Sequence, residues 1–217
     1  MSAAEITYRA GKIITAQAQS FGMGIATYPL APKKIVPTPS PWFSFNPPEG
    51  NTYLAAADRI LRGEFDVFAL ERVQLGFPPV WNRDPSTGIE APLQFGKQLD
   101  YRDAAQVGDI KYLWEPNRHL EFVTLAQAYS VNHDERYLTG LRVIIESWLS
   151  QCPYLIGANW ASSLELAIRL INWSLAWPVI GGAGSPLFRD EAGETLRRKW
   201  LDSIYQHSHF IAGAYSR

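Results

Sequence analysis

The sequence predicts a mainly α fold in which antiparallel helical hairpins follow an extended, proline-rich N-terminal segment. Apolar residues recur at helical spacing in four successive series over the second half of the 217-residue chain, and only short joints separate the series. A hydrophobic content of 47% with 19% charged residues is typical of a globular domain rather than of a disordered chain. At this length we expect one domain with a sizeable core.

The N-terminal part predicts a helix followed by a connector. The helix is expected over Ala3 to Phe21, and Gly22 and Gly24 can end it. The stretch Pro29 to Pro48 holds seven prolines, which remove backbone donors and favour extended conformations. We therefore assign residues 1–50 to a helix and a connector, and residues 51–217 to one helical domain.

A short helix and one or two short strands are expected next. Asn51 can cap a helix over Thr52 to Leu61, which stops near Gly63. From Glu64 to Trp81 apolar and polar residues partly alternate, which predicts the strands. The stretch Asn82 to Gly108 is polar and rich in turn residues, so it is expected to be irregular.

Four amphipathic helices are expected after Asp109, and their short joints predict antiparallel hairpins. Pro153 and Pro178 close the second and the third of these helices. The apolar positions of the four series are Phe122, Leu125, Ala126 and Tyr129; Tyr137, Leu141, Ile144, Ile145 and Trp148; Trp160, Leu164, Ala167, Ile168, Ile171 and Leu175; and Ala192, Leu196, Trp200, Ile204 and Ile211.

Composition excludes several classes of function. With 20 basic and 21 acidic residues and no basic run, the chain lacks the electrostatic footprint of a nucleic-acid-binding protein. No stretch approaches the roughly 20 apolar residues that cross a membrane. The single cysteine, Cys152, allows no intramolecular disulfide. Residues Met1 to Gly24 lack the basic start and apolar run of a secretion signal, so a cytoplasmic location is expected.

The segment Asp109 to His119 combines side chains that suit an acidic sugar. A helix is expected to begin near Pro116, which places Asn117, Arg118 and His119 in the first turn, where the helix dipole favours an anion. Lys111 and Trp114 lie upstream in a stretch expected not to be helical. The structural alternative is a surface ion pair between Glu115 and Arg118, with Trp114 in the core.

A second group of polar residues lies in the third helix. Glu165, Arg169 and Asn172 are spaced i, i+4 and i+7, so they share one face, opposite much of the apolar stripe. This face is either exposed to solvent or lines a cleft. In a cleft, Glu165 would fix Arg169 for a sugar carboxylate, and Asn159 and Trp160 would supply an amide and a stacking surface.

These two segments resemble the N-terminal part of the heparinase II/III-like family of polysaccharide lyases, which includes alginate lyase-like members. The resemblance rests on the spacing of DxKxxWExNR over Asp109 to Arg118 and of NWxxxxExAIRxxNW over Asn159 to Trp173. It implies an (α/α) toroid, of which residues 51–217 would form the N-terminal part. It also implies that the partner is an acidic, uronate-containing polysaccharide. Relatives of this family are often exported, so a periplasmic location stays open.

The resemblance implies cleavage by β-elimination without a cofactor. In the family Asn and His commonly neutralise the uronate carboxylate, while Tyr and His act as base and acid. A segment like Tyr205 to Ile211 precedes the catalytic Asn-Asn-His motif, which we expect beyond Arg217, together with the other half of the toroid and a β-sandwich. The 217-residue chain alone is therefore expected to be inactive. Within it, Tyr205, His207 and His209 are the first candidates for catalysis.

Two further functions stay open: a non-catalytic carbohydrate-binding module, and a structural helical-hairpin domain that docks on a partner. No metal site is expected, because His207 and His209 are two residues apart and diverge on a helix. Uncovered helices predict self-association through Leu196, Trp200 and Ile204. The substrate-binding residues are expected to converge on one concave surface, and the set with the strongest claim is Lys111, Trp114, Asn117, Arg118, Asn159, Trp160 and Arg169.

Overall fold

The computed structural model describes residues 2–24, 29–33 and 50–213, and it confirms a mainly α fold with one small sheet. The elements in chain order are α1 (Ala3–Ser20), α2 (Gly50–Leu61), β1 (Glu64–Val67), β2 (Leu70–Gln74), η2 (Gly96–Gln98), α3 (Ala104–Val107), α4 (Ile110–Trp114), η3 (Pro116–Arg118), α5 (Leu120–Asn132), α6 (Glu135–Gln151), η4 (Ala158–Trp160), α7 (Ser163–Val179), η5 (Gly182–Gly184), η6 (Pro186–Phe188) and α8 (Glu191–Gly213).

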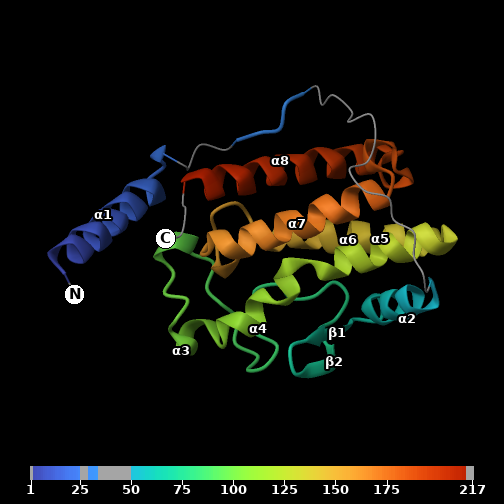
Figure 1. Cartoon of the computed structure of the whole chain (residues 1–217), viewed down its shortest axis with the longest axis horizontal. Coiled ribbons are helices and arrows are strands. Elements are labelled where there is room, and N and C mark those ends of the chain that lie inside the picture. The colour runs from blue at the N-terminus through green and yellow to red at the C-terminus, as the bar shows by residue number, and fades with distance from the viewer. Residues whose placement is uncertain (1, 25–28, 34–49, 214–217) are drawn as a thin grey trace.

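The four expected helices of the second half form two antiparallel hairpins, α5–α6 and α7–α8, which lie side by side (Figure 1). Helix α5 packs against α7, and α6 packs against α8, so the hairpins make two layers, with α2 added beside α5. The α5–α6 joint has two residues: His133 takes a left-handed φ of 55°, and Asp134 caps α6 by accepting a hydrogen bond from the backbone of Arg136. The toroid stays a prediction from the resemblance.

Tryptophans fill the core between the two layers. Trp148, Trp173 and Trp200 are each at most 1% exposed. The ring centroids of Trp148 and Trp173 are 5.7 Å apart, those of Trp173 and Trp200 are 6.1 Å apart, and both pairs meet edge to face. Rings of this size dominate the burial energy of a core, and the edge-to-face geometry adds to it. These rings therefore connect α6, α7 and α8 at the centre of a core that aliphatic side chains complete.

The expected strands form a two-stranded antiparallel sheet at the edge of the helical layers (Figure 1). Phe65 pairs with Val73, and the pairing is irregular between Phe65 and Val67. Both of these β1 side chains are buried in the main core, which anchors the sheet. The tight connection needs a left-handed residue, and Phe68 supplies it with a φ of 52°.

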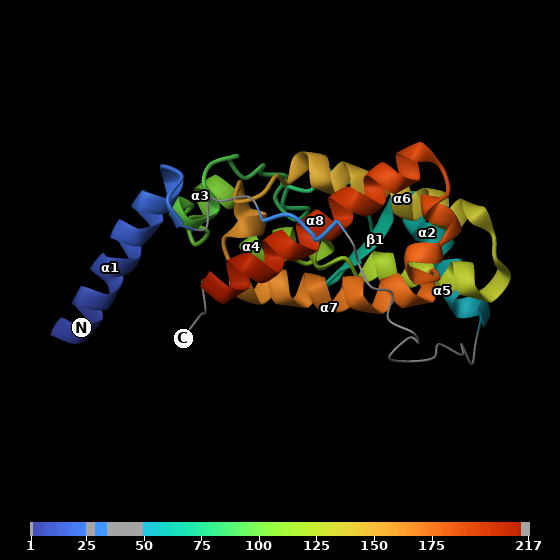
Figure 2. The same ribbon diagram turned by 90° about the horizontal axis from the view of Figure 1, so that it is seen from above.

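The N-terminal arm is largely exposed. Helix α1 ends one residue earlier than expected and projects from the body (Figure 2). Its side chains are exposed except near its end, where Gln19 is buried. A short piece of the connector lies on α8, where the backbone N–H of Ala31 donates to Asp202 over 2.7 Å. Most of the expected extended stretch, residues 34–48, lies outside the described residues.

Two expected helix starts are wrong. Asn51 lies inside α2, which begins at Gly50, so it is not the cap. No α-helix begins at Pro116: the segment folds as α4, then the short 3-10 helix η3 that Pro116 starts, and α5 begins only at Leu120. His119 breaks the helical path with a φ of 63°, and this turns Asn117 into the interior. Lys111 and Trp114 are accordingly helical.

The expected orientation of α7 is wrong, because its polar residues face the core. Glu165 and Arg169 are 4% and 0% exposed, whereas Leu164 and Ile171 are 59% and 58% exposed. Periodicity predicts that the apolar stripe faces the interior. In the structure Arg118 and His207, which belong to other segments, hydrogen-bond to Glu165 and Arg169, so these two charged side chains can be buried. On α8 the expected exposure of Leu196 and Trp200 is also wrong, since both are buried within the chain.

Candidate functional site

The motif residues form a connected network between the Asp109–His119 segment and α7. Arg118 donates to both carboxylate oxygens of Glu165, at 2.8 and 3.1 Å, and to Glu115 at 2.5 Å. The amide of Asn172 donates to the carbonyl of Arg118 at 2.8 Å. The hydrogen bond and charge of Glu165 raise the pKa of Arg118 despite its partial burial, so this group stays charged. These contacts join two segments that lie about 50 residues apart in the sequence.

Asn117 is the centre of the network. Its amide nitrogen donates to the carbonyls of Trp81 and Leu113, both at 2.8 Å, and its oxygen accepts from the indole N–H of Trp148 at 2.9 Å. The side chain is fully buried. Because every polar atom of the amide has a partner, Asn117 connects three segments and offers no free group to a ligand.

Arg169 is a fully buried cation that is held without a direct carboxylate bond. Its Nε donates to the carbonyl of Asn117 at 2.7 Å, and a second nitrogen lies 2.9 Å from Nε2 of His207. The guanidinium also stands 4.5 Å from the ring centre of Trp148. Burial lowers the pKa of Arg169 to about 10, with the nearby Cys152 and Glu165 opposing this. The group therefore stays protonated at neutral pH.

The hydrogen bonds assign the tautomers of the two buried histidines. Nδ1 of His207 lies 2.7 Å from the carbonyl of Ser203, so it carries the proton and Nε2 accepts from Arg169. In His119, Nδ1 accepts from the indole N–H of Trp173 at 2.8 Å. Burial, followed by the charge of Arg169, lowers the pKa of both histidines well below the ordinary value. Both rings are neutral and belong to the core.

Asn159 and Trp160 are also interior residues. The amide nitrogen of Asn159 lies 3.2 Å from the sulfur of Cys152, and the indole of Trp160 donates to the Cys152 carbonyl at 3.1 Å. The indole of Trp114 donates to the carbonyl of Ala158 at 2.9 Å. Trp114, Asn159 and Trp160 are each at most 9% exposed. Their hydrogen bonds connect the η4 turn to α4 and to Cys152 at the end of α6.

The structure thus brings together most of the expected site residues, but not on a concave surface. Asn117, Asn159, Trp160 and Arg169 are buried, and Lys111 stands exposed outside the network. The expectation of one open surface is therefore wrong. The three catalytic candidates also fail to converge: His207 is buried, while Tyr205 on the same helix is 41% exposed and His209 is only partly buried.

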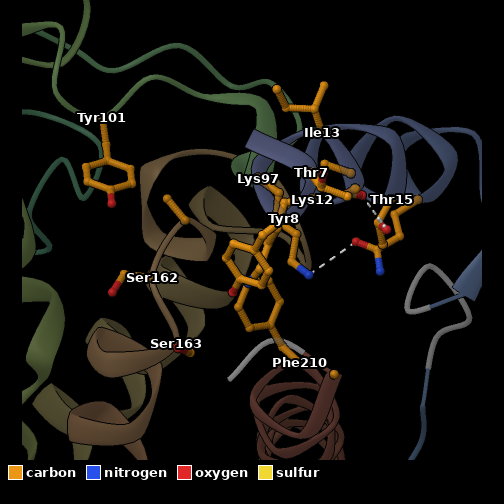
Figure 3. A pocket seen from close by; sticks show the side chains of 15 residues that line it. Thr7, Tyr8, Lys12, Ile13, Thr15, Lys97, Tyr101, Ser162, Ser163 and Phe210 are labelled. Carbon is orange, nitrogen blue, oxygen red and sulfur yellow. Dashed lines mark hydrogen bonds between the residues drawn. The ribbon is translucent and has the colours of Figure 1, made fainter. Parts of the chain in front are cut away.

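An open groove lies instead between α1, the η2 turn, the start of α7 and the end of α8 (Figure 3). Its volume is about 690 Å³, which is in the range of small-molecule sites. The side chains that matter for ligand chemistry come from all four elements or their flanks, as Figure 3 shows. They are Thr7, Tyr8, Lys12, Thr15, Lys97, Tyr101, Ser162, Ser163 and Phe210.

Lys97 and Lys12 make the groove positive. Nζ of Lys97 donates to the side-chain oxygen of Gln19 at 3.2 Å and stands 4.8 Å from the ring centre of Phe210. Burial, with the nearby charge of Lys12, lowers the pKa of Lys97 to about 8. Two cations placed this close favour an anion between them, because the anion relieves both the repulsion and the desolvation.

The start of α7 adds backbone donors to the same groove. Ser162 is the N-cap residue of α7, but its side chain accepts no hydrogen bond from the backbone of the first turn. The first-turn N–H groups of this 17-residue helix and its dipole therefore favour negative charge. Ser162 and Ser163 add hydroxyls, and Tyr101 and Tyr8 add ring faces. Sequence reasoning missed this groove, because Lys12, Lys97 and Phe210 belong to no common motif.

No protein-family model, curated protein or solved structure matches the chain. Within residues 2–24, 29–33 and 50–213, no group of three or more His, Cys, Asp or Glu side chains is placed to hold a metal ion. No helix of this part of the chain is long and apolar enough to span a membrane. We therefore take the groove as the candidate site. The buried network of motif residues holds the η4 turn and α7, whose start forms one wall of the groove.

Proposed function

We propose that this chain is the N-terminal helical portion of a polysaccharide lyase and that it binds an acidic, uronate-containing polysaccharide in the groove. One observation carries the proposal: two lysines stand beside aromatic rings and an uncapped helix start in an open groove. Carboxylates suit the lysines and the helix start, whereas the rings and hydroxyls suit the faces and edges of pyranose rings. The resemblance of the two motifs supports the lyase class.

The buried network has a supporting role in this proposal. It joins the η4 turn and α7 to the Asp109–His119 segment, and both Ala161 and Ser162 at the start of α7 line the groove. A rigid framework keeps the helix start in place, which is what a binding site requires. In a β-elimination the groove would hold a sugar carboxylate, and the base and acid would have to come from other parts of the protein, because neither Tyr205 nor His209 lines the groove.

A titration with oligouronates tests the binding step. Wild-type protein should bind a hexuronate more tightly than a neutral oligosaccharide of equal length. Lys97→Ala removes a charged hydrogen bond worth roughly 1.5–3 kcal/mol, so affinity should fall by about 10-fold to 150-fold. Lys111→Ala is the matched control, because Lys111 is exposed outside the groove. Equal losses in the two variants, or binding of the neutral sugar alone, would contradict the proposal.

A second candidate is a non-catalytic module that binds the same sugars. The buried, neutral state of His207 and its separation from the exposed Tyr205 favour it. The 217-residue chain should bind without forming product under either candidate, so the coding sequence beyond Arg217 separates the two. An Asn-Asn-His motif in a further helical half selects the lyase, and its absence selects the module; unsaturated product from the 217-residue chain itself would also select the lyase.

A further inference from the structure

The outward face of α7 carries an apolar stripe that the described parts of the chain leave uncovered. Leu164 and Ile171 are 59% and 58% exposed. Ile168 lies between them and Leu175 lies one turn beyond Ile171 on the same side of the helix; both are partly exposed, and Leu175 also packs against the edge of the core. The only charged side chains of α7 are on the opposite, buried face. The solvent-facing side of this 17-residue helix is therefore free of charge.

The spacing of the stripe matches the seam of a two-helix coiled coil. Leu164, Ile168, Ile171 and Leu175 follow one another at intervals of four, three and four residues, which is the heptad pattern of inward positions. The stripe is also symmetric about the middle of the helix. An antiparallel copy of the same helix would bring Leu164 opposite Leu175, and Ile168 opposite Ile171, across a two-fold axis.

We infer that α7 packs against α7 of a second copy of this chain, antiparallel across a two-fold axis. Two identical faces without charge meet with no like-charge repulsion. The symmetry of the stripe favours a second copy over an unrelated partner, and the absence of a basic residue on the exposed side of α7 argues against a membrane surface.

Sedimentation equilibrium of the full chain tests the dimer. Wild-type protein should be dimeric at tens of micromolar, and Ile171→Glu should be monomeric with an unchanged melting temperature. Leu93→Glu is the control, because Leu93 is 61% exposed outside the stripe, and it should stay dimeric. If Ile171→Glu unfolds, Ile171→Ser takes its place. A monomeric wild type, a dimeric Ile171 variant, or dissociation caused by Ile13→Glu on α1 would each overturn the inference.

Disulfide trapping tests the antiparallel register. The variant Leu164→Cys with Leu175→Cys should cross-link into covalent dimers under mild oxidation. Leu164→Cys alone should not, because two copies of residue 164 would lie about 16 Å apart along the paired helices, too far for a disulfide. The native Cys152 is buried and serves as the silent background. Rapid cross-linking of Leu164→Cys alone would overturn the antiparallel arrangement.

Discussion

Asn117 is the residue whose removal tests the buried network most directly. Its side chain makes three hydrogen bonds, to the carbonyls of Trp81 and Leu113 and from the indole of Trp148, and it is fully buried. Asn117→Ala removes all three hydrogen bonds, and the Trp81 carbonyl keeps only the longer 3.4 Å bond from the Asn159 amide. Each unmet buried group costs about 1 kcal/mol or more, so the free energy of unfolding should fall by about 3 kcal/mol.

The effect is large enough to measure by thermal and urea unfolding. For a chain of this size 1 kcal/mol corresponds to a shift of roughly 2–4 °C, so the melting temperature should fall by about 6–12 °C. The bond from Arg169 to Asn117 uses the backbone carbonyl, and the substitution keeps it. Fluorescence should report the change, because Trp148 loses its partner.

Asn172→Ala is the matched control for this prediction. The Asn172 amide is partly exposed and donates to one carbonyl, that of Arg118. Its loss should cost about 1 kcal/mol, since water can replace the missing partner. If Asn117→Ala destabilises the protein no more than Asn172→Ala does, the amide is not the structural centre that its contacts indicate.

Three more outcomes are expected. Arg118→Ala should lower the free energy of unfolding by about 1–3 kcal/mol, because it leaves the buried carboxylate of Glu165 unpaired; urea unfolding measures this, and an unchanged midpoint would contradict it. Burial raises the pKa of Glu121 to about 8 from an ordinary value of 4.5, and its Oε2 has no partner in the described part of the chain. The folded state therefore holds this proton more tightly than the unfolded state does, and stability is lost as pH rises from 4.5 to about 8. Glu121→Gln should flatten that dependence in melting curves, and an identical pH profile would refute the assignment. Burial lowers the pKa of Lys97 to about 8, so affinity for an oligouronate should fall as pH rises through this value, and Lys97→Arg, titrated in parallel, should keep its affinity.

Local patterns were sufficient for the long helices of this protein, but not for the short helices α3 and α4, which lie in stretches expected to be non-helical. The apolar series of α5, α6 and α8 pointed to the core, and Tyr137, Leu141 and Trp148 are buried as their spacing predicts. Alternation predicted the short strands, and Phe65 and Val67 face the core. These elements follow from sequence because helical and strand periods depend on neighbours within a few residues. Composition likewise predicted the absence of a membrane span, and no helix within residues 2–24, 29–33 and 50–213 is long and apolar enough to form one.

Tertiary structure alone decided which face of α7 is buried. Periodicity predicted that its apolar stripe faces the interior, and the partners of Glu165 and Arg169 reverse that assignment, since Arg118 and His207 lie 47 and 38 residues away in sequence. Burying a charged side chain is favourable only where hydrogen-bonding or oppositely charged partners are in place to compensate for the lost hydration. The groove has the same origin. Lys12 and Lys97 line the same groove because α1 packs against the η2 turn. The two residues are far apart in the sequence, so no local pattern predicts this contact.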